Sequence, residues 1–352
     1  MNGTIKVLDC TLRDGGQCLE DLNKNGMKTE QFTEADCKNI ALLVQEAKIE
    51  IIELGCIEES DINKENFASY CDLNAISAYI PKRKNNHQIF VGLYTGPDAD
   101  LDRIPPRDSS LCDGIRVILR YSELQKSIDY CRALARKGYL VFVQPMLTMR
   151  YSDCELAGLI DAVNDMGAFA LYLVDSFGYM DEHDVERLYA FYNKRLEKNI
   201  HIGFHAHNNS EMAFCNVKHF LKQFQNRDVI IDSCVSGMGQ GAGNMQTEIL
   251  VNYLNQEYGK DYNLNSILEV CEILEKFKPY EMETWGYSPV RFVPAMHGAA
   301  YKYAVAMRQQ YHMTLSQIND LFSSMPAEMK HRYTQENLKK LLEIGRYQEI
   351  RG

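Results

Sequence analysis

Apolar runs rich in β-branched residues recur along the first two thirds of the chain and alternate with amphipathic segments. The segments between them, such as residues 33–48 and 181–198, repeat with the period of a helix. Short strands that alternate with helices predict parallel βαβ units with right-handed crossovers. Eight such strands in roughly 240 residues are typical of an α/β fold, the (β/α)8 or TIM barrel. The predicted strands are residues 5–11, 51–56, 88–95, 114–120, 140–146, 170–176, 200–207 and 229–237.

The alternation ends near Gly259. Beyond it the pattern predicts helices only, at residues 266–278, 294–311, 314–322 and 334–343. We therefore predict a TIM-barrel catalytic domain at residues 1–259, followed by a helical C-terminal domain at residues 260–352.

The composition of the chain limits which kinds of partner it can bind and in which cellular compartment we expect it. A net charge of -10 argues against nucleic acid or an anionic membrane surface as a partner. No apolar stretch approaches the ~20 residues of a membrane span, and the N-terminus lacks a signal-peptide pattern. The 11 cysteines follow no disulfide or metal spacing, which is typical of reduced thiols in the cytoplasm. We expect a cytoplasmic protein.

Two short segments almost two hundred positions apart suggest one metal site. Arg13 and Asp14 follow the first predicted strand, and His205 and His207 end the seventh. Side chains two apart on a strand share a face, and barrel strands present their carboxyl ends at one mouth. One carboxylate and two imidazoles suit Mn²⁺, Mg²⁺ or Zn²⁺ with open positions for substrate. A 2-oxo acid can chelate such an ion, which then stabilises an enolate while Arg13 holds the substrate.

Two further segments lie at the ends of predicted strands at the same mouth. Ser176, the last residue of the sixth strand, either binds substrate or caps the next helix. The glycine-rich residues 236–244 follow the eighth strand, where they form either a tight turn that shapes the site or an anion cradle.

Three motifs in this order resemble those of the DRE-TIM metallolyases, which carry a pyruvate carboxyltransferase-type domain. They are residues 8–16 (LDCTLRDGG), 205–208 (HAHN) and 237–244 (GMGQGAGN). Residues 285–290 (WGYSPV) through Tyr303 are similar to the helical region that follows the barrel in the 4-hydroxy-2-oxovalerate aldolase branch. The resemblance spans nearly the whole chain.

The resemblance implies specific roles for individual residues. It implies a divalent cation, Mn²⁺ or Mg²⁺, bound by Asp14, His205 and His207. Arg13 is expected to stabilise a pyruvate enolate and Ser176 to hold the pyruvate carboxylate. Tyr287 is expected to be catalytic, because it falls near a site tyrosine of these aldolases.

One position departs from the aldolase pattern. Those aldolases carry a general acid/base histidine four residues after the motif arginine, and here the position is Gln17, which does not titrate near neutrality. Arg-Asp-Gly-x-Gln is instead the pattern of the lyase and synthase branches. We keep Gln17 as a candidate catalytic residue. Other candidates for moving the proton are Cys18, Glu20, Tyr179, Tyr287 and His297.

The favoured function is cleavage of a 4-hydroxy-2-oxo acid to pyruvate and an aldehyde, or the reverse. A Claisen-type acyltransferase or CoA lyase is one alternative, and a barrel that binds a 2-oxo acid without turnover is another. A metallo-hydrolase is disfavoured, because barrel amidohydrolases place His-x-His on strand one. The resemblance implies an aldehyde dehydrogenase partner bound through the C-terminal helices, and we expect a homo-oligomer.

Overall fold

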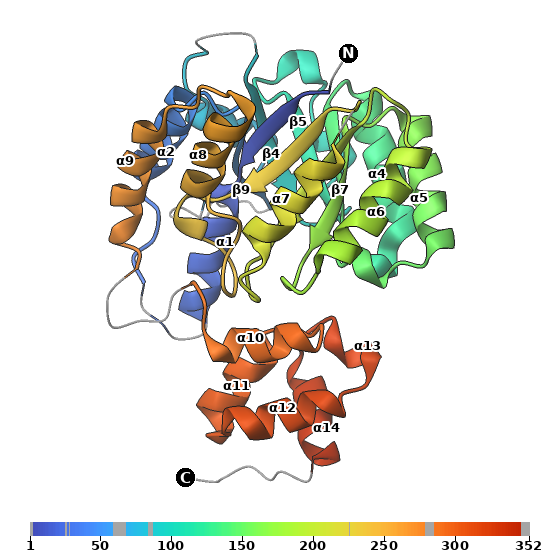
Figure 1. Cartoon of the computed structure of the whole chain (residues 1–352). Coiled ribbons are helices and arrows are strands. Elements are labelled where there is room, and N and C mark those ends of the chain that lie inside the picture. The colour runs from blue at the N-terminus through green and yellow to red at the C-terminus, as the bar shows by residue number, and fades with distance from the viewer. Residues whose placement is uncertain are drawn as a thin grey trace.

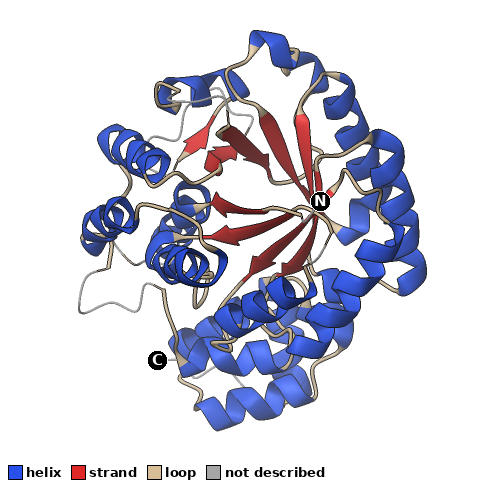
Figure 2. Ribbon diagram, turned by 45° about the horizontal axis from the view of Figure 1, so that its top comes forward, coloured by secondary structure: helices blue, strands red, loops and turns tan. Residues whose placement is uncertain are grey.

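The computed structural model describes residues 3–24, 27, 29–58, 68–83, 87–224, 226–278 and 285–345. Eight parallel strands close into a barrel, because β1 pairs with both β9 and β2, and a short strand, β3, lies beside β2 (Figure 2). The strands are β1 (Ile5–Asp9), β2 (Ile51–Ile57), β3 (Ser69–Tyr70), β4 (Ile89–Tyr94), β5 (Gly114–Leu119), β6 (Leu140–Pro145), β7 (Ala170–Asp175), β8 (His201–Ala206) and β9 (Val229–Ser233). The predicted (β/α)8 barrel is confirmed.

Helices surround the barrel (Figure 1). Capping boxes at Thr33 and Ser152 start two of them, and the left-handed Gly167 ends the second of the two. The helices are α1 (Thr11–Lys24), α2 (Glu34–Glu46), α3 (Leu73–Ile76), α4 (Leu124–Arg136), α5 (Asp153–Met166), α6 (Glu182–Arg195), α7 (Ala213–Gln223), α8 (Thr247–Tyr258) and α9 (Leu264–Glu275). Short 3-10 helices are η1 (Ser77–Tyr79), η2 (Leu101–Arg103), η3 (Arg107–Ser109), η4 (Tyr121–Glu123), η5 (Thr148–Arg150) and η6 (Val235–Gly237).

The first strand is shorter than predicted. It ends at Asp9, and α1 begins at Thr11, so the Arg13–Gly16 segment is helical and does not form a strand end or a turn. The Asp9 carboxylate accepts hydrogen bonds from both the backbone and the hydroxyl of Thr11, which starts the helix. Gly15 packs closely within it, because a Cβ there would lie 2.6 Å from the Met238 sulfur and this side chain would have to move.

The C-terminal helices form a layer at the carboxyl ends of the strands (Figure 1). They are α10 (Pro289–Met296), α11 (Lys302–Tyr311), α12 (Leu315–Ser323), α13 (Ala327–Lys330) and α14 (Gln335–Ile344). The predicted single helix at residues 294–311 is wrong: Gly298, with φ +59°, lies between α10 and α11. Pro294 lies inside α10 and does not start a helix.

The barrel and the C-terminal layer have separate hydrophobic cores. The barrel core includes Ile267 and Leu274 of α9 and extends to Trp285, whereas the core of the C-terminal layer begins at Val293. Phe177, which follows β7, packs against that second core. The domain boundary at residue 259 stays a prediction. Within the described residues, none of the helices combines the length and apolar character needed to cross a bilayer.

Candidate metal centre and active-site cavity

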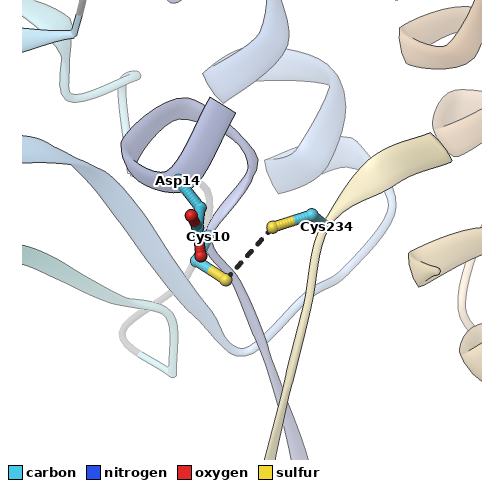
Figure 3. Close-up of side chains that lie close together, drawn as sticks. All are labelled: Cys10, Asp14 and Cys234. Carbon is cyan, nitrogen blue, oxygen red and sulfur yellow. Dashed lines mark hydrogen bonds between the residues drawn. The ribbon is translucent and has the colours of Figure 1, made fainter. Parts of the chain in front are cut away.

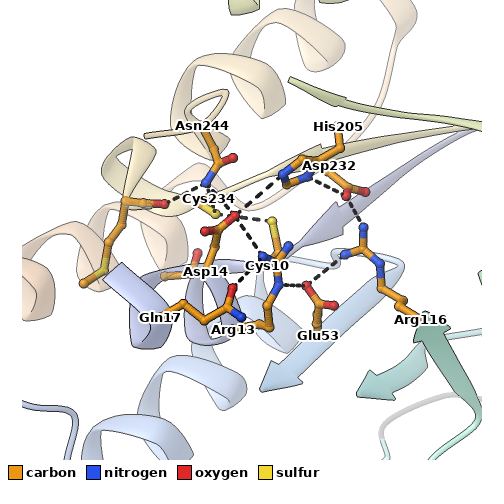
Figure 4. A network of polar contacts seen from close by, with 12 residues as sticks. Cys10, Arg13, Asp14, Gln17, Glu53, Arg116, His205, Asp232, Cys234 and Asn244 are labelled. Carbon is orange, nitrogen blue, oxygen red and sulfur yellow. Dashed lines mark hydrogen bonds and ion pairs between the residues drawn. The ribbon is translucent and has the colours of Figure 1, made fainter. Parts of the chain in front are cut away.

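The carboxyl ends of the strands bring the two predicted motifs together. Arg13 and Asp14 lie in the first turn of α1, and the Asp14 backbone N–H donates to the Cys10 carbonyl. His205 is on β8 and His207 is one residue beyond its end, with ring centroids 5.0 Å apart. Figure 4 shows Asp14 and His205 pointing toward each other from α1 and β8.

Asp14, His205 and His207 form a possible ligand set for a cation. One donor atom from each lies within 4.8 Å of the other two. The Nε2 atom of His205 is 3.6 Å from Oδ2 of Asp14. One hard oxygen and two imidazole nitrogens are a donor set that Mn²⁺, Mg²⁺ or Zn²⁺ accepts.

Local charges favour the ionised form of Asp14, and burial favours the neutral form of His207. Burial raises the pKa of the Asp14 carboxyl, but Arg13 and the two imidazoles outweigh burial and lower that pKa to about 2. Burial lowers the pKa of His207 to about 4, and among the described residues its buried Nδ1 has no hydrogen-bond partner. Because a cation binds carboxylate and neutral imidazole, these states fit a metal site.

His205 lies between two carboxylates. Its Nδ1 donates to Oδ2 of Asp232 at 2.9 Å, while its Nε2 faces Asp14. Burial alone lowers the pKa of His205, but Asp232 and Cys10 outweigh burial and raise the pKa to about 9, so a cation has to displace the proton from this ring. A carboxylate on one ring nitrogen fixes the ring and directs the other nitrogen toward a cation.

A buried ion-pair network supports both Arg13 and His205 (Figure 4). Arg116 pairs with Asp232 and, at 2.8 Å, with Glu53, which also accepts from Nε of Arg13 at 2.8 Å. The network crosses the barrel interior from α1 through β2 and β5 to β9, and Glu53 and Arg116 are fully buried. The sequence analysis missed these three supporting residues.

A cavity of about 190 Å³ opens beside the donor set. Arg13, Gln17 and Ser176 line it together with Asp14 and the two histidines. Its apolar wall consists of Leu93, Ile118, Met146, Leu147, Val174 and Phe177. The C-terminal layer contributes one described lining residue, His331.

The remaining predicted site residues have defined environments. Gln17 Oε1 accepts from Arg13 Nη1 at 3.2 Å, and Ser176 Oγ accepts from the Leu147 backbone at 2.9 Å. Ser176 does not cap α6, whose N-cap is Asp181. Tyr287 lies outside the lining and is 53% exposed.

The glycine-rich segment presents a residue that the sequence analysis did not single out. Asn244 is buried, and its Nδ2 donates to Oδ2 of Asp14 at 3.0 Å. Its Oδ1 has no hydrogen-bond partner within the described chain. An isolated bridge pairs Asn244 with His207, so the segment forms a turn that connects two sides of the donor set.

Gly243→Ala is expected to disturb this turn. Gly243 has φ +86°, and an added Cβ would lie 1.8 Å from the Gly237 carbonyl oxygen, so the backbone that carries Asn244 has to move. We expect Mn²⁺ affinity to fall roughly 10–100-fold, the range for lost supporting contacts at metal sites. Calorimetric titration with Mn²⁺ measures this change.

Gly167→Ala is the matched control. Gly167 also has a positive φ, +62°, but a Cβ there meets no atom within 4 Å. In this variant the left-handed backbone at alanine should lower the free energy of unfolding by about 1–2 kcal/mol, and Mn²⁺ affinity should stay unchanged. Equal Mn²⁺ affinity in both variants would contradict the role assigned to the turn.

Two thiols lie close to Asp14 (Figure 3). Cys10 and Cys234, one residue past β1 and β9, have Sγ atoms 3.3 Å apart, and each thiol belongs to a donor group with Asp14. Both thiols are fully buried, and neither lines the cavity. Of the two sets, the Asp14–His205–His207 set is the one that faces the cavity. All eleven cysteines are free thiols.

None of the proton-transfer candidates named above other than Gln17 lines the cavity within the described chain. Burial raises the pKa of Cys18 far above its usual range and that of Tyr179 to about 12. Glu20 pairs with Lys24 at 2.7 Å. His297 bonds to Asn319 at 2.9 Å and stacks on Phe322, a structural arrangement.

The fold and the site together define a (β/α)8 barrel with a candidate metal centre at the carboxyl ends of its strands. The family model described as HMGL-like matches residues 4–274. The chain belongs to this family, and the resemblance drawn from its three motifs is confirmed.

Known relatives match most of the chain. A 4-hydroxy-2-oxovalerate aldolase of Pelotomaculum thermopropionicum is 26% identical over 280 residues, 77% of this chain and 76% of that protein. The aldolase of the same name from Thermomicrobium roseum is 26% identical over 99% of this chain and 88% of its own length. The crystal structure of hydroxymethylglutaryl-CoA lyase from Pseudomonas aeruginosa superposes with a TM-score of 0.62 at 15% identity, covering 78% and 94% of the two chains, which shows the shared fold.

Proposed function

We propose that this protein is a carbon–carbon lyase of aldolase type that depends on a divalent cation. It cleaves a 4-hydroxy-2-oxo acid into pyruvate and an aldehyde, or catalyses the reverse. The observation that carries the proposal is the convergence of Asp14, His205 and His207 within 4.8 Å at a cavity that Arg13 also lines. The relatives named 4-hydroxy-2-oxovalerate aldolase support the same reaction class.

The residues of the cavity have complementary roles in this reaction. Asp14, His205 and His207 would hold the cation, Mn²⁺ or Mg²⁺, which would supply Lewis-acid stabilisation of negative charge on the 2-oxo group. Arg13, held by Glu53, donates hydrogen bonds to the same end of the substrate. Ser176 binds the carboxylate from β7, and Gln17 orients Arg13 through its side-chain amide.

Removal of the cation is expected to abolish catalysis. After treatment with a chelator, the protein should neither cleave 4-hydroxy-2-oxovalerate nor exchange the methyl protons of pyruvate with deuterium. Added Mn²⁺ should restore both reactions, measured by pyruvate release and by proton NMR, and calorimetry should show one Mn²⁺ site. Tight Mn²⁺ binding without proton exchange under any condition would overturn the aldolase proposal.

The CoA alternative depends on Gln17 and on the fold shared with CoA lyases. It predicts release of free thiol when acetyl-CoA and a 2-oxo acid are supplied together, which a thiol reagent detects. The binding-only alternative predicts that pyruvate raises the melting temperature and that no product forms. It also predicts that Gln17→His leaves both results unchanged. Retro-aldol cleavage by the wild-type protein excludes both alternatives as its sole function.

The setting of the reaction is also part of the proposal. Free thiols are typical of cytoplasmic proteins, so we place the reaction in the cytoplasm. A catalytic role of Tyr287, a homo-oligomer, and an aldehyde dehydrogenase bound through the C-terminal helices stay predictions.

A further inference from the structure

The cavity includes a histidine from outside the barrel. His331 follows α13 in the C-terminal layer, yet it lines the same cavity as Arg13, Asp14 and Gln17. More than three hundred residues separate it from the N-terminal motif, and no motif of the sequence analysis includes it. The C-terminal layer therefore adds a titratable side chain to the site.

Apart from the three residues of the cation-binding set, the other described lining residues cannot serve as a proton acceptor near neutral pH. The amides of Gln17, Gln144 and Gln240 do not titrate, and the Ser176 hydroxyl is too weakly basic. Arg13 remains charged between Asp14 and Glu53. Among the described lining residues, His331 is the one imidazole outside the cation-binding set.

Backbone contacts hold His331 in place over the cavity. The carbonyl of Lys330 accepts from the backbone N–H of Ala300 at 2.9 Å. The buried hydroxyl of Tyr303 lies 2.9 Å from the carbonyl oxygen of Met329 and 2.8 Å from that of Arg332. These contacts fix the backbone on both sides of His331 to the start of α11 and the residues before it, so the backbone that carries the ring is preorganised.

The ring itself has an unused polar atom. Nδ1 of His331 is buried and has no hydrogen-bond partner among the described residues. No hydrogen bond to the described chain therefore fixes Nδ1, and the ring, which lines the cavity, can present its other nitrogen, Nε2, to a substrate hydroxyl.

We propose that His331 is the general base of retro-aldol cleavage and the general acid of the reverse reaction. This inference rests on the proposed function. The neutral imidazole takes the proton of the C4 hydroxyl, and the O–H electron pair forms the C4=O bond of the aldehyde. The C3–C4 bond breaks, and its electron pair forms the enolate of pyruvate. In the reverse direction the imidazolium returns the proton to the aldehyde oxygen. His331 thus supplies the function that Gln17 lacks.

The charges around His331 favour its neutral form. Burial lowers the pKa of His331, and the cations Arg150 and Lys330 lower it further. Across the cavity lie the charged pair Arg13 and Asp14 and the two imidazoles of the cation site. A base of this kind is active at neutral pH and loses activity only as the pH falls below about 6.5, the usual histidine pKa.

A pair of substrates separates this inference from the proposed function. Cleavage of 4-hydroxy-2-oxovalerate requires a base that removes the proton of the C4 hydroxyl. Decarboxylation of oxaloacetate forms the same pyruvate enolate, but no hydroxyl proton has to be removed. For His331→Asn we expect kcat/KM for aldol cleavage to fall roughly 10²–10⁴-fold, with little change in oxaloacetate decarboxylation. The acid limb of the wild-type pH profile for aldol cleavage should disappear in the variant.

His312→Asn is the matched control. His312 is an exposed histidine of the same layer with φ +51°, a conformation that asparagine tolerates. It does not line the cavity, so both reactions should keep their wild-type rates. Equal loss of both reactions in His331→Asn, or no loss in either, would overturn the role of His331. Absence of both reactions in the wild-type protein would instead contradict the proposed function.

Discussion

Replacement of Arg116 by methionine is expected to destabilise the barrel by about 3–5 kcal/mol. Arg116 is fully buried and is the cation that Glu53 and Asp232 share in the barrel interior. Methionine fills a similar volume but leaves each carboxylate short of one partner in a region of low dielectric constant. Urea unfolding followed by circular dichroism measures the loss as a lower midpoint.

The control for this variant is Arg120→Met. Arg120 also pairs with two carboxylates, Asp98 and Glu123, but its side chain is 36% exposed. Exposed ion pairs contribute about 0–1 kcal/mol, so this change should leave the urea midpoint almost unmoved. If both variants unfold at the same urea concentration, the interior network does not stabilise the fold as argued.

The alternation of apolar runs and amphipathic segments was sufficient to predict the barrel, because a parallel strand covered by helices is apolar along its whole length. It was not sufficient at the first helix. Gly15 and Gly16 are poor helix formers, and α1 starts at Thr11 through hydrogen bonds to Asp9 that local propensity does not reveal. Tertiary packing overrode the local preference there.

The supporting charges of the site had a usable signal in the sequence. Glu53, Arg116 and Asp232 are single charged residues inside apolar strands, and a charge in such a position has to be paired. Their mixed signs predict an interior network. Which of them pair cannot be read from the sequence, because the pairing depends on the closure of the barrel.

His331 had no comparable signal. It belongs to a short turn between two helices, and its importance comes from how the C-terminal layer covers the cavity. The motifs therefore suggested other candidates for the proton-transfer group, namely Cys18, Glu20, Tyr179, Tyr287 and His297. The contacts of Tyr303 with the backbone around His331 belong to the tertiary structure.

Asp14→Asn is expected to abolish both cation binding and catalysis. Asparagine keeps the shape of the side chain but removes the charge that Arg13 and the two imidazoles stabilise. Because loss of a supporting contact alone weakens metal binding by roughly 10–100-fold, loss of a direct ligand should exceed that range. Titration calorimetry with Mn²⁺ and the pyruvate exchange assay measure the two effects separately.

Asp98→Asn distinguishes loss of this ligand from loss of a negative charge in general. Asp98 is 53% exposed and pairs with Arg120 and Lys126 at the surface, so its removal should leave Mn²⁺ affinity and exchange at wild-type levels. With a pKa of about 2, Asp14 stays ionised throughout the assay range, so protonation of Asp14 cannot account for a weak site above pH 5. Unchanged Mn²⁺ affinity in Asp14→Asn would mean that the cation lies elsewhere, and the roles of Arg13 and Ser176 would no longer follow.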